Sequence, residues 1–178
     1  MNTRTTRMLA GVTAVAALVT MTATASPRPT EGDAARSLFE RFKAIEGSWQ
    51  TTSTAGWNEV STFEVIARGS VVMGITTFRD APDRKMVTMY YLDGDELVAV
   101  HYCEARNQPF LVASKLDAEA GEVTFNFRDG GNIPTRDRGH MDQAVYRFVD
   151  GDRFSSRWTW YQDGEEQWLE EIEYRRIR

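Results

Sequence analysis

Two histidines and a single cysteine are the residues of this chain whose chemistry suits acid–base, nucleophilic or metal-binding roles. His101 and Cys103 are two positions apart in an apolar segment, so on a β-strand their side chains face the same side. This spacing permits a thiolate–imidazole pair or half of a metal site, to which only His140 could add an imidazole. A buried, inert thiol beside a hydrogen-bonded histidine is the preferred interpretation, and ligand contact by His101 is the next. We therefore assign no catalytic residue and no metal site, and leave any cofactor unassigned.

Other polar side chains could orient a bound molecule. Asn107 and Asn132 carry amides that either bind a polar ligand group or hold loops together at a barrel rim. Glu170 falls among the aromatic positions of the last apolar segment, where a carboxylate must either meet an arginine or line a wet lumen. We predict that the ligand-binding residues are His101, Tyr90, Tyr102, Asn107, Asn132, His140 and Glu170.

We expect His101 and His140 to face one cavity. His140 lies in the segment 129–142, which has no hydrophobic periodicity and is long for a connection in a compact domain. A buried histidine needs hydrogen-bond partners, and this loop is the nearby segment richest in them. The loop would then close over the mouth of a barrel, with Asn107 and Asn132 beside the two imidazoles. The alternative is that His101 points outward under a helix and His140 sits in solvent.

The elements that must position these residues are mostly β-strands. The segment 87–109 contains two apolar runs folded back over the turn-forming triplet 93–95, and both faces of this hairpin are apolar. Such strands must be covered on both faces, so the rest of the chain has to wrap around them. We predict strands near 48–54, 58–67, 70–79, 85–92, 96–104, 109–116, 121–128, 143–149, 153–161 and 166–177, with turns at 68–69, 81–83, 93–95, 119–121, 150–152 and 163–165.

Short links between consecutive strands make a meander, and a long meander removes its edges by closing into a barrel. One helix is predicted from Asp33, which can cap it, up to Gly47, which stops it, with Leu38, Phe42 and Ile45 on one apolar stripe. We expect this helix to plug or cover the barrel; docking of the same stripe on a partner protein is the alternative. The fold class is therefore mainly β: an antiparallel up-and-down β-barrel of about ten strands with one N-terminal α-helix.

Gly47-Ser48-Trp49 opens the first predicted strand, and Arg175 and Arg176 lie near the end of the last one. A tryptophan beneath such an arginine would form a cation–π contact at the base of the barrel. In this the sequence resembles the lipocalin-like, or calycin, group of small-ligand-binding barrels, in which a G-x-W at the first strand meets a late arginine. The blocks YYLDGDELVAVHYC, NQP and GHM are similar to a set of uncharacterised secreted bacterial proteins of lipocalin-like type. The resemblance covers most of the chain beyond its first 25 residues, implies a lipocalin-like barrel and supplies no established activity.

The first 25 residues have the three parts of a secretory signal peptide. Arg4 and Arg7 give a positive start, an apolar run covers 8–20, and small residues at 23–25 form a cleavage pattern. The run is shorter than the roughly 20 apolar residues that a membrane-spanning helix needs, so we expect no membrane span after signal cleavage. The chain then divides into a signal peptide (1–25), a flexible leader (26–32) and one barrel domain (33–178), and the expected location is secreted or periplasmic.

A formal net charge of −5 argues against nucleic acid or an anionic membrane surface as the partner. No Ser-His-Asp arrangement, P-loop, zinc-protease helix or dinucleotide-binding glycine pattern occurs. We expect an exported barrel that binds a small apolar or amphipathic molecule with one polar end. The alternatives are an enzyme that uses the same cavity with a histidine as acid–base, and an inhibitory or dimerising protein, for example a homodimer, whose outward apolar hairpin face is the contact surface.

Cleavage after Ala25 predicts that the protein in its own host begins at Ser26 and is found outside the cytoplasm. N-terminal sequencing of the purified protein checks this. Recovery of intact Met1 in a membrane fraction would contradict it.

Overall fold

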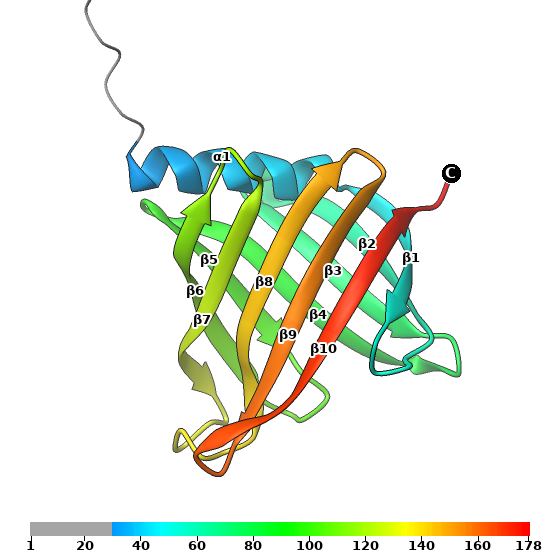
Figure 1. Ribbon diagram of the computed structural model, residues 1–178, viewed down its shortest axis with the longest axis vertical. Helices are drawn as coiled ribbons and strands as arrows, with labels where there is room; N and C mark the ends of the chain where they lie inside the picture. Colours follow the sequence, from blue (N-terminus) through cyan, green and yellow to red (C-terminus); the bar gives the residue numbers. More distant parts are fainter. Residues whose placement is uncertain (1–29) are drawn as a thin grey trace, which may run out of the picture.

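A computed structural model describes residues 30–178 as a closed β-barrel with one α-helix lying across one end (Figure 1). The predicted signal peptide, 1–25, and most of the predicted leader, 26–32, lie outside the described residues. The elements are α1 (Glu31–Ala44), β1 (Gly47–Ser53), β2 (Glu59–Ile66), the short 3₁₀ turn η1 (Ala67–Gly69), β3 (Val71–Phe78), β4 (Ala81–Asp93), β5 (Glu96–Tyr102), β6 (Gln108–Asp117), β7 (Glu122–Gly131), β8 (His140–Asp150), β9 (Arg153–Gln162) and β10 (Glu165–Arg176).

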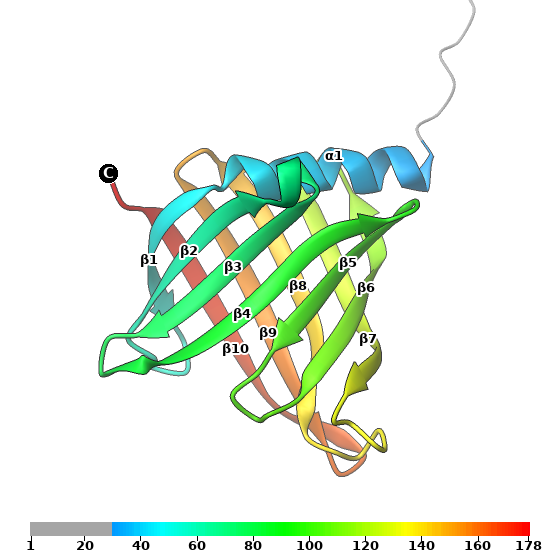
Figure 2. The ribbon, with the colours of Figure 1, turned by 180° about the vertical axis from the view of Figure 1, so that it is seen from behind.

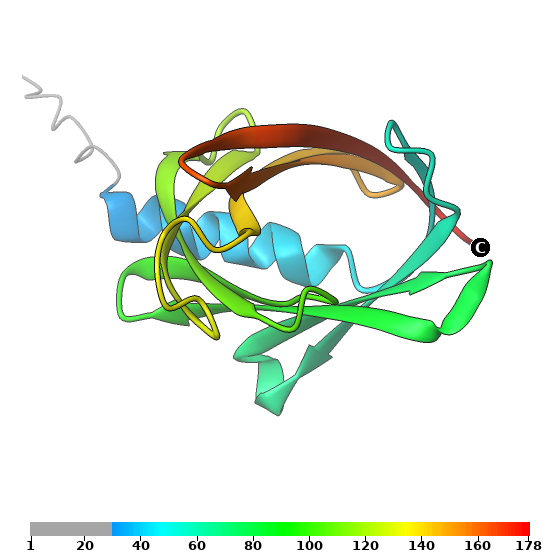
Figure 3. The ribbon, with the colours of Figure 1, turned by 90° about the horizontal axis from the view of Figure 1, so that it is seen from below.

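Each strand pairs in antiparallel fashion with its neighbours along the chain, and β10 pairs with β1 to close the sheet. Closure gives every strand of the described barrel two partners, which removes the exposed edges of an open sheet. The view from the end opposite α1 shows the ring of strands with the helix behind it (Figure 3). The predicted fold, a mainly β up-and-down barrel of ten strands with an N-terminal helix, is confirmed.

The turn predicted at 81–83 is wrong: the chain reverses at 79–80 instead. Ala81 already pairs with Phe78, and the register then shifts before Lys85 pairs with Thr77. Such an irregularity accommodates Pro82, which cannot donate to the hydrogen-bond ladder. Pro82 therefore lies in the irregular pairing just after the turn and not in the turn itself.

The loop predicted at 129–142 is also shorter than expected, because β7 continues to Gly131 and β8 begins at His140. Gly130 and Gly131 fall in the predicted loop, but in the structure they belong to β7 and allow two strands to approach closely. Gly130 pairs with Pro109, and a Cβ atom on Gly130 would lie 2.9 Å from the carbonyl oxygen of Gln108. The remaining loop, 132–139, lies at the end of the barrel opposite α1 (Figure 1).

Helix α1 closes its end of the barrel, as the two side views show (Figures 1 and 2). The side chain of Thr30 accepts from the backbone N–H of Asp33, and the Asp33 carboxylate accepts from the backbone N–H of Thr30, so Thr30 is the cap and the helix starts two residues before the predicted position. Leu38 and Phe42 are fully buried, and the Phe42 ring stacks on Tyr90 with centroids 4.3 Å apart. The apolar face of the helix is thus occupied inside this chain and is not available to a partner.

Arg176 joins the helix to the two strands that close the barrel. Its guanidinium lies 4.3 Å from the ring centre of Trp49, which is fully buried. The same group donates to the carbonyl oxygens of Glu46 at 2.7 Å and Ala44 at 3.1 Å, which stand at the helix C-terminus where carbonyls lack intrahelical partners. The cation–π contact implied by the G-x-W segment and a late arginine is therefore present, and Arg176 makes it rather than Arg175. Within residues 30–178, no helix is long and apolar enough to cross a membrane.

Replacing Arg176 by lysine should lower the free energy of unfolding by about 1–3 kcal/mol, because an ammonium cannot reproduce the planar fork that holds two carbonyls and the tryptophan face. Urea unfolding measures the change. Arg175→Lys is the matched control: its side chain is 70% exposed, and the expected change is within about 0.5 kcal/mol. Equal effects of the two substitutions would contradict this role of Arg176.

Candidate functional site

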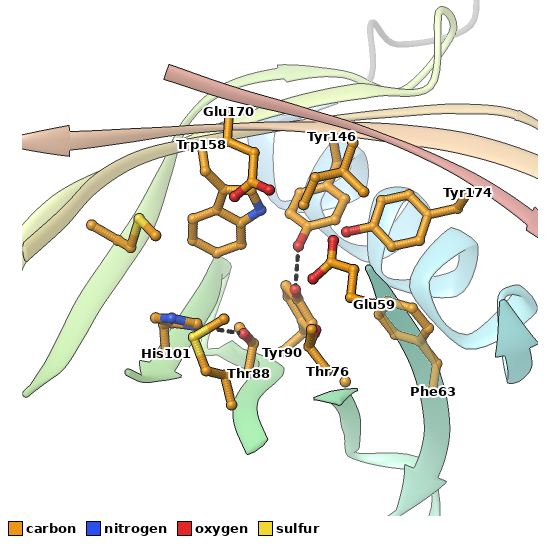
Figure 4. A pocket seen from close by; sticks show the side chains of 14 residues that line it. Glu59, Phe63, Thr76, Thr88, Tyr90, His101, Tyr146, Trp158, Glu170 and Tyr174 are labelled. Atoms are coloured by element: carbon orange, nitrogen blue, oxygen red, sulfur yellow. Dashed lines mark hydrogen bonds between the residues drawn. The ribbon is translucent and has the colours of Figure 1, made fainter. Parts of the chain in front are cut away.

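The barrel is packed with aromatic rings on the side of α1 and contains a small cavity farther from it. Next to the helix, Phe42 lies 5.2 Å from Tyr146 and 4.9 Å from Phe148, measured between ring centres. Beyond these rings a cavity opens between the strands (Figure 4). Its volume is about 40 Å³, on a scale where one buried water needs about 10–15 Å³. The lining residues are Glu59, Phe63, Gly74, Thr76, Met86, Thr88, Tyr90, His101, Met141, Tyr146, Trp158, Glu170, Ile172 and Tyr174.

Strand alternation explains why polar and aromatic residues meet there. Side chains two positions apart on a strand face the same side, so Glu59 on β2 points inward with Phe63, while Glu64 is exposed. On β10, Glu170 points inward with Tyr174 for the same reason. The two carboxylates stand on the two strands that flank β1, and both enter the cavity.

Glu59 is the most unusual member of the lining. Its side chain is 4% exposed, and its Oε1 atom has no hydrogen-bond partner. Burial, followed by the nearby charge of Glu170, raises the pKa of Glu59 to about 7. Glu59 thus changes between a neutral acid and a buried anion close to neutral pH.

Glu170 has the partner that Glu59 lacks. It accepts a hydrogen bond from the hydroxyl of Ser53 on the neighbouring strand β1. Burial raises the pKa of Glu170, and this hydrogen bond acts against the increase. Two positions were predicted for Glu170, beside an arginine or in the wall of a lumen. The structure places it in the cavity wall.

His101 faces the same cavity from β5 and is 5% exposed. Its Nδ1 atom shares a 2.8 Å hydrogen bond with the hydroxyl of Thr88, and its ring centre lies 5.2 Å from that of Trp158. The Nε2 atom has no partner. Burial lowers the pKa of His101 to about 4, so the imidazole is neutral at neutral pH.

Three tyrosines complete the polar surface. The hydroxyls of Tyr90 and Tyr146 share a hydrogen bond, and that of Tyr174 is 3.1 Å from the Ser156 hydroxyl. Burial raises the pKa of all three phenols, which keeps them neutral. Tyr90 was predicted as a ligand-binding residue, and it lies in the cavity wall.

Tyr102, also predicted, does not line the cavity. It follows His101 on β5, so its side chain points to the opposite face, where it is 47% exposed. Alternation alone separates these two residues, since they cannot both point inward on a regular strand.

His140 lies apart from His101, contrary to the expectation that they share a cavity. It is fully buried, with Nδ1 at the carbonyl oxygen of Arg138 and Nε2 3.3 Å from an oxygen of Asp142. Its neighbour Met141 lines the cavity, so the histidine faces the other way, with its ring centre 4.2 Å from that of Phe127. Local partners in its own segment satisfy this imidazole, and it does not need the barrel interior.

Asn107 and Asn132 connect loops instead of entering the cavity. Asn107 donates through Nδ2 to the carbonyl oxygen of Gly139 at 2.7 Å, and Asn132 donates to that of Arg106 at 3.1 Å. Both bonds tie the β5–β6 turn to the loop between β7 and β8. Of the two roles considered for these amides, their contacts match the one in which they hold loops together.

Cys103 does not form a pair with His101. Strand β5 ends at Tyr102, and the cysteine lies beyond it, with its backbone N–H donating to the carbonyl oxygen of Asn107. Burial raises the pKa of the thiol, which disfavours the reactive thiolate. In the part of the chain that the structure describes, no three His, Cys, Asp or Glu side chains are grouped to hold a metal ion.

Sequence reasoning missed Glu59, although a signal was present. Glu59, Ser61 and Phe63 alternate with more polar or exposed positions, so the inward direction of Phe63 also fixes that of Glu59. The predicted strand 58–67 already contains Glu59, but a glutamate is rarely buried without a partner, so its inward direction was not predicted.

No protein-family model matches this chain, and no curated protein matches it. Among solved structures, a protein of unknown function of the DUF3598 family from Nostoc punctiforme is similar with a TM-score of 0.48 and 12% identity; the match covers 76% of this chain and 49% of that protein. This chain thus spans about half the length of that protein. The structure of EF1p2_mFAP2b bound to DFHBI is similar with a TM-score of 0.33 and 9% identity, over 79% of this chain and 99% of the other. Both similarities are distant, so the function of the barrel has to be inferred from its own residues.

Glu59→Gln should stabilise the protein at pH 8 and change little at pH 5. The folded pKa of Glu59 is about 7 against an ordinary value of 4.5. Between these values the folded state keeps a proton that the unfolded state has lost, so the free energy of unfolding falls as the pH rises. Glutamine has no charge to bury, and the variant avoids a loss of roughly 2–4 kcal/mol at pH 8.

Urea unfolding of variant and wild type at both pH values measures this difference. His101 titrates with the opposite sign, because its lowered pKa makes stability rise between about pH 4 and 6.5; the difference between the two proteins removes that contribution. Glu64→Gln, exposed on the same strand, is the control and should behave alike at both pH values. A Glu59→Gln effect that does not grow with pH would refute the assignment.

Proposed function

We propose that this barrel binds a small molecule whose polar end docks against Glu59 and His101, with its less polar part among the aromatic rings. The observation that supports this most directly is the pair of unpartnered atoms, Oε1 of Glu59 and Nε2 of His101, in two buried side chains that line one cavity. Buried polar atoms almost always have a partner in the protein or in bound molecules. Two such atoms facing one space are what a binding site leaves open for its ligand.

The size of the cavity favours a small ligand or the end of an elongated one. A volume of about 40 Å³ accommodates a few non-hydrogen atoms without rearrangement. Met86 and Met141 lie in the lining, and methionine side chains change shape at little cost, so a somewhat larger group can enter. Because α1 closes the opposite end, we infer that the ligand enters from the end at which Glu59 begins β2.

Binding is favoured over acid–base catalysis by His101. Its pKa of about 4 makes it a weak base, its Nδ1 is held by Thr88, and Cys103 is not in the cavity to act as a nucleophile. The dimerisation alternative has no comparable support, because on the outward face of β5 Val98 is buried and Val100 half-buried, which leaves only Tyr102 exposed among its apolar residues. We also propose that the protein works outside the cytoplasm, on the basis of the signal-peptide pattern in its first 25 residues.

Native mass spectrometry of the protein purified from its own host should reveal a mass above that of the polypeptide, from a bound small molecule. His101→Phe should lose most of this adduct, because it removes one polar partner of the ligand, worth about 1–3 kcal/mol. Tyr102→Phe, one position away and on the outer face, should retain it.

Thermal melts confirm that each variant is folded before its adduct is compared. An unliganded wild type in every preparation, or equal retention by the two variants, would count against the proposed site.

A further inference from the structure

We propose that the polar end of the ligand is an organic cation, an ammonium or guanidinium group, seated between Glu59 and Glu170. This inference rests on the proposed binding function and goes further by naming the charge of the ligand. It excludes the anionic amphiphiles, such as carboxylates with an apolar tail, that an apolar barrel would otherwise suit.

The charge balance of the cavity is the first support. Two carboxylates enter it, and no Lys or Arg side chain is part of its lining. The other titratable groups that face Glu59 are neutral at neutral pH: His101 on β5 through its lowered pKa, and the buried tyrosines of β4, β8 and β10 through their raised pKa. An ionised carboxylate without a counter-charge is costly to bury, and a ligand cation supplies the counter-charge that the chain does not.

The open hydrogen-bond positions are the second and independent support. The unpartnered Oε1 of Glu59 can only accept hydrogen bonds once the acid is ionised. The unpartnered Nε2 of His101 is likewise an acceptor when Nδ1 donates to Thr88. An ammonium or guanidinium group offers several N–H donors and no acceptor, so it complements the chemistry of both open positions.

The walls of the cavity suit a cation as well. Trp158 is the cross-strand neighbour of Glu170, and both line the cavity together with Tyr146 and Phe63 (Figure 4). Aromatic faces attract an organic cation through their negative π-surface and give no such stabilisation to an anion. A metal ion is the poorer candidate, because residues 30–178 contain no group of three or more metal-ligating side chains.

The test compares ligands that share a body and differ in charge. The purified protein is titrated at pH 8 with 2-phenylethylamine, 2-phenylethanol and 3-phenylpropionate, and then with butylamine, butanol and pentanoate, by calorimetry and by tryptophan fluorescence. We expect one of the amines to bind at least about 10-fold more tightly than the alcohol of the same body, and the carboxylates to bind most weakly.

Charge-removing variants locate the effect. Glu59→Gln and Glu170→Gln should each weaken amine binding about 10-fold and leave alcohol binding nearly unchanged. The controls, Glu64→Gln on β2 and Glu171→Gln on β10, remove the same charge from exposed positions and should bind the amine as the wild type does. Amine affinity of the wild type should fall about 10-fold from pH 8 to pH 5.5, because Glu59 takes up a proton in that range.

The outcomes separate the two proposals. Alcohol or carboxylate binding as tight as that of the amine overturns the cation inference and leaves the binding function standing, as does equal loss of amine binding in the exposed controls. If none of the six compounds binds to the folded protein, the cation inference fails, and the adduct seen by native mass spectrometry decides the binding function separately. Glu59→Gln keeps the test decisive if Glu170→Gln does not fold, since Glu59 has no hydrogen bond at Oε1 to lose.

Discussion

The interior of a closed barrel of ten strands is wider than its inward-facing side chains can fill. The rest of the structure depends on what fills the remaining space. Barrels of about eight strands are just filled by side chains or hold one small ligand. Here α1 inserts Phe42 onto Tyr90 and closes one end, and Arg176 holds the helix C-terminus against Trp49 and the closing strand β10. Because one helix cannot fill the whole length, a cavity of about 40 Å³ remains farther from it.

The two halves have opposite energetic roles. The helix side is an aromatic core whose burial stabilises the fold. The far side contains Glu59, Glu170 and His101, each of which is harder to bury than an apolar residue of similar size. The hydroxyls of Tyr90 and Tyr146 mark the boundary, since their rings pack on Phe42 while both residues also line the cavity. The packed half can therefore maintain the fold while the other half keeps unpaired polar atoms.

Periodicity and turn residues predicted the fold well, because a meander is specified locally. Each short link fixes the next antiparallel pair, and the G-x-W segment with a late arginine indicated the closing contact. The candidate site was predicted only in part: His101, Tyr90 and Glu170 line the cavity, whereas Tyr102 does not. Predicting Tyr102 together with His101 is inconsistent with alternation, because adjacent residues on a strand point to opposite faces. The direction of His140 depends on the register of β8, where the pairing shifts between Met141 and Gln143, and a sequence carries no clear mark of such a shift.

What the cavity residues have in common is that folding alone does not require them. Glutamine at position 59 would remove a charge that the fold has no means to neutralise, and an apolar residue in place of His101 would remove an orphan nitrogen. Residues that are locally unfavourable for folding tend to occur at functional sites, because elsewhere the residues agree with the packing of the fold. Here an unpaired carboxylate, a second buried carboxylate and a half-satisfied imidazole come from three different strands and meet in one small space. Their convergence on one cavity is what the proposal of a bound molecule rests on.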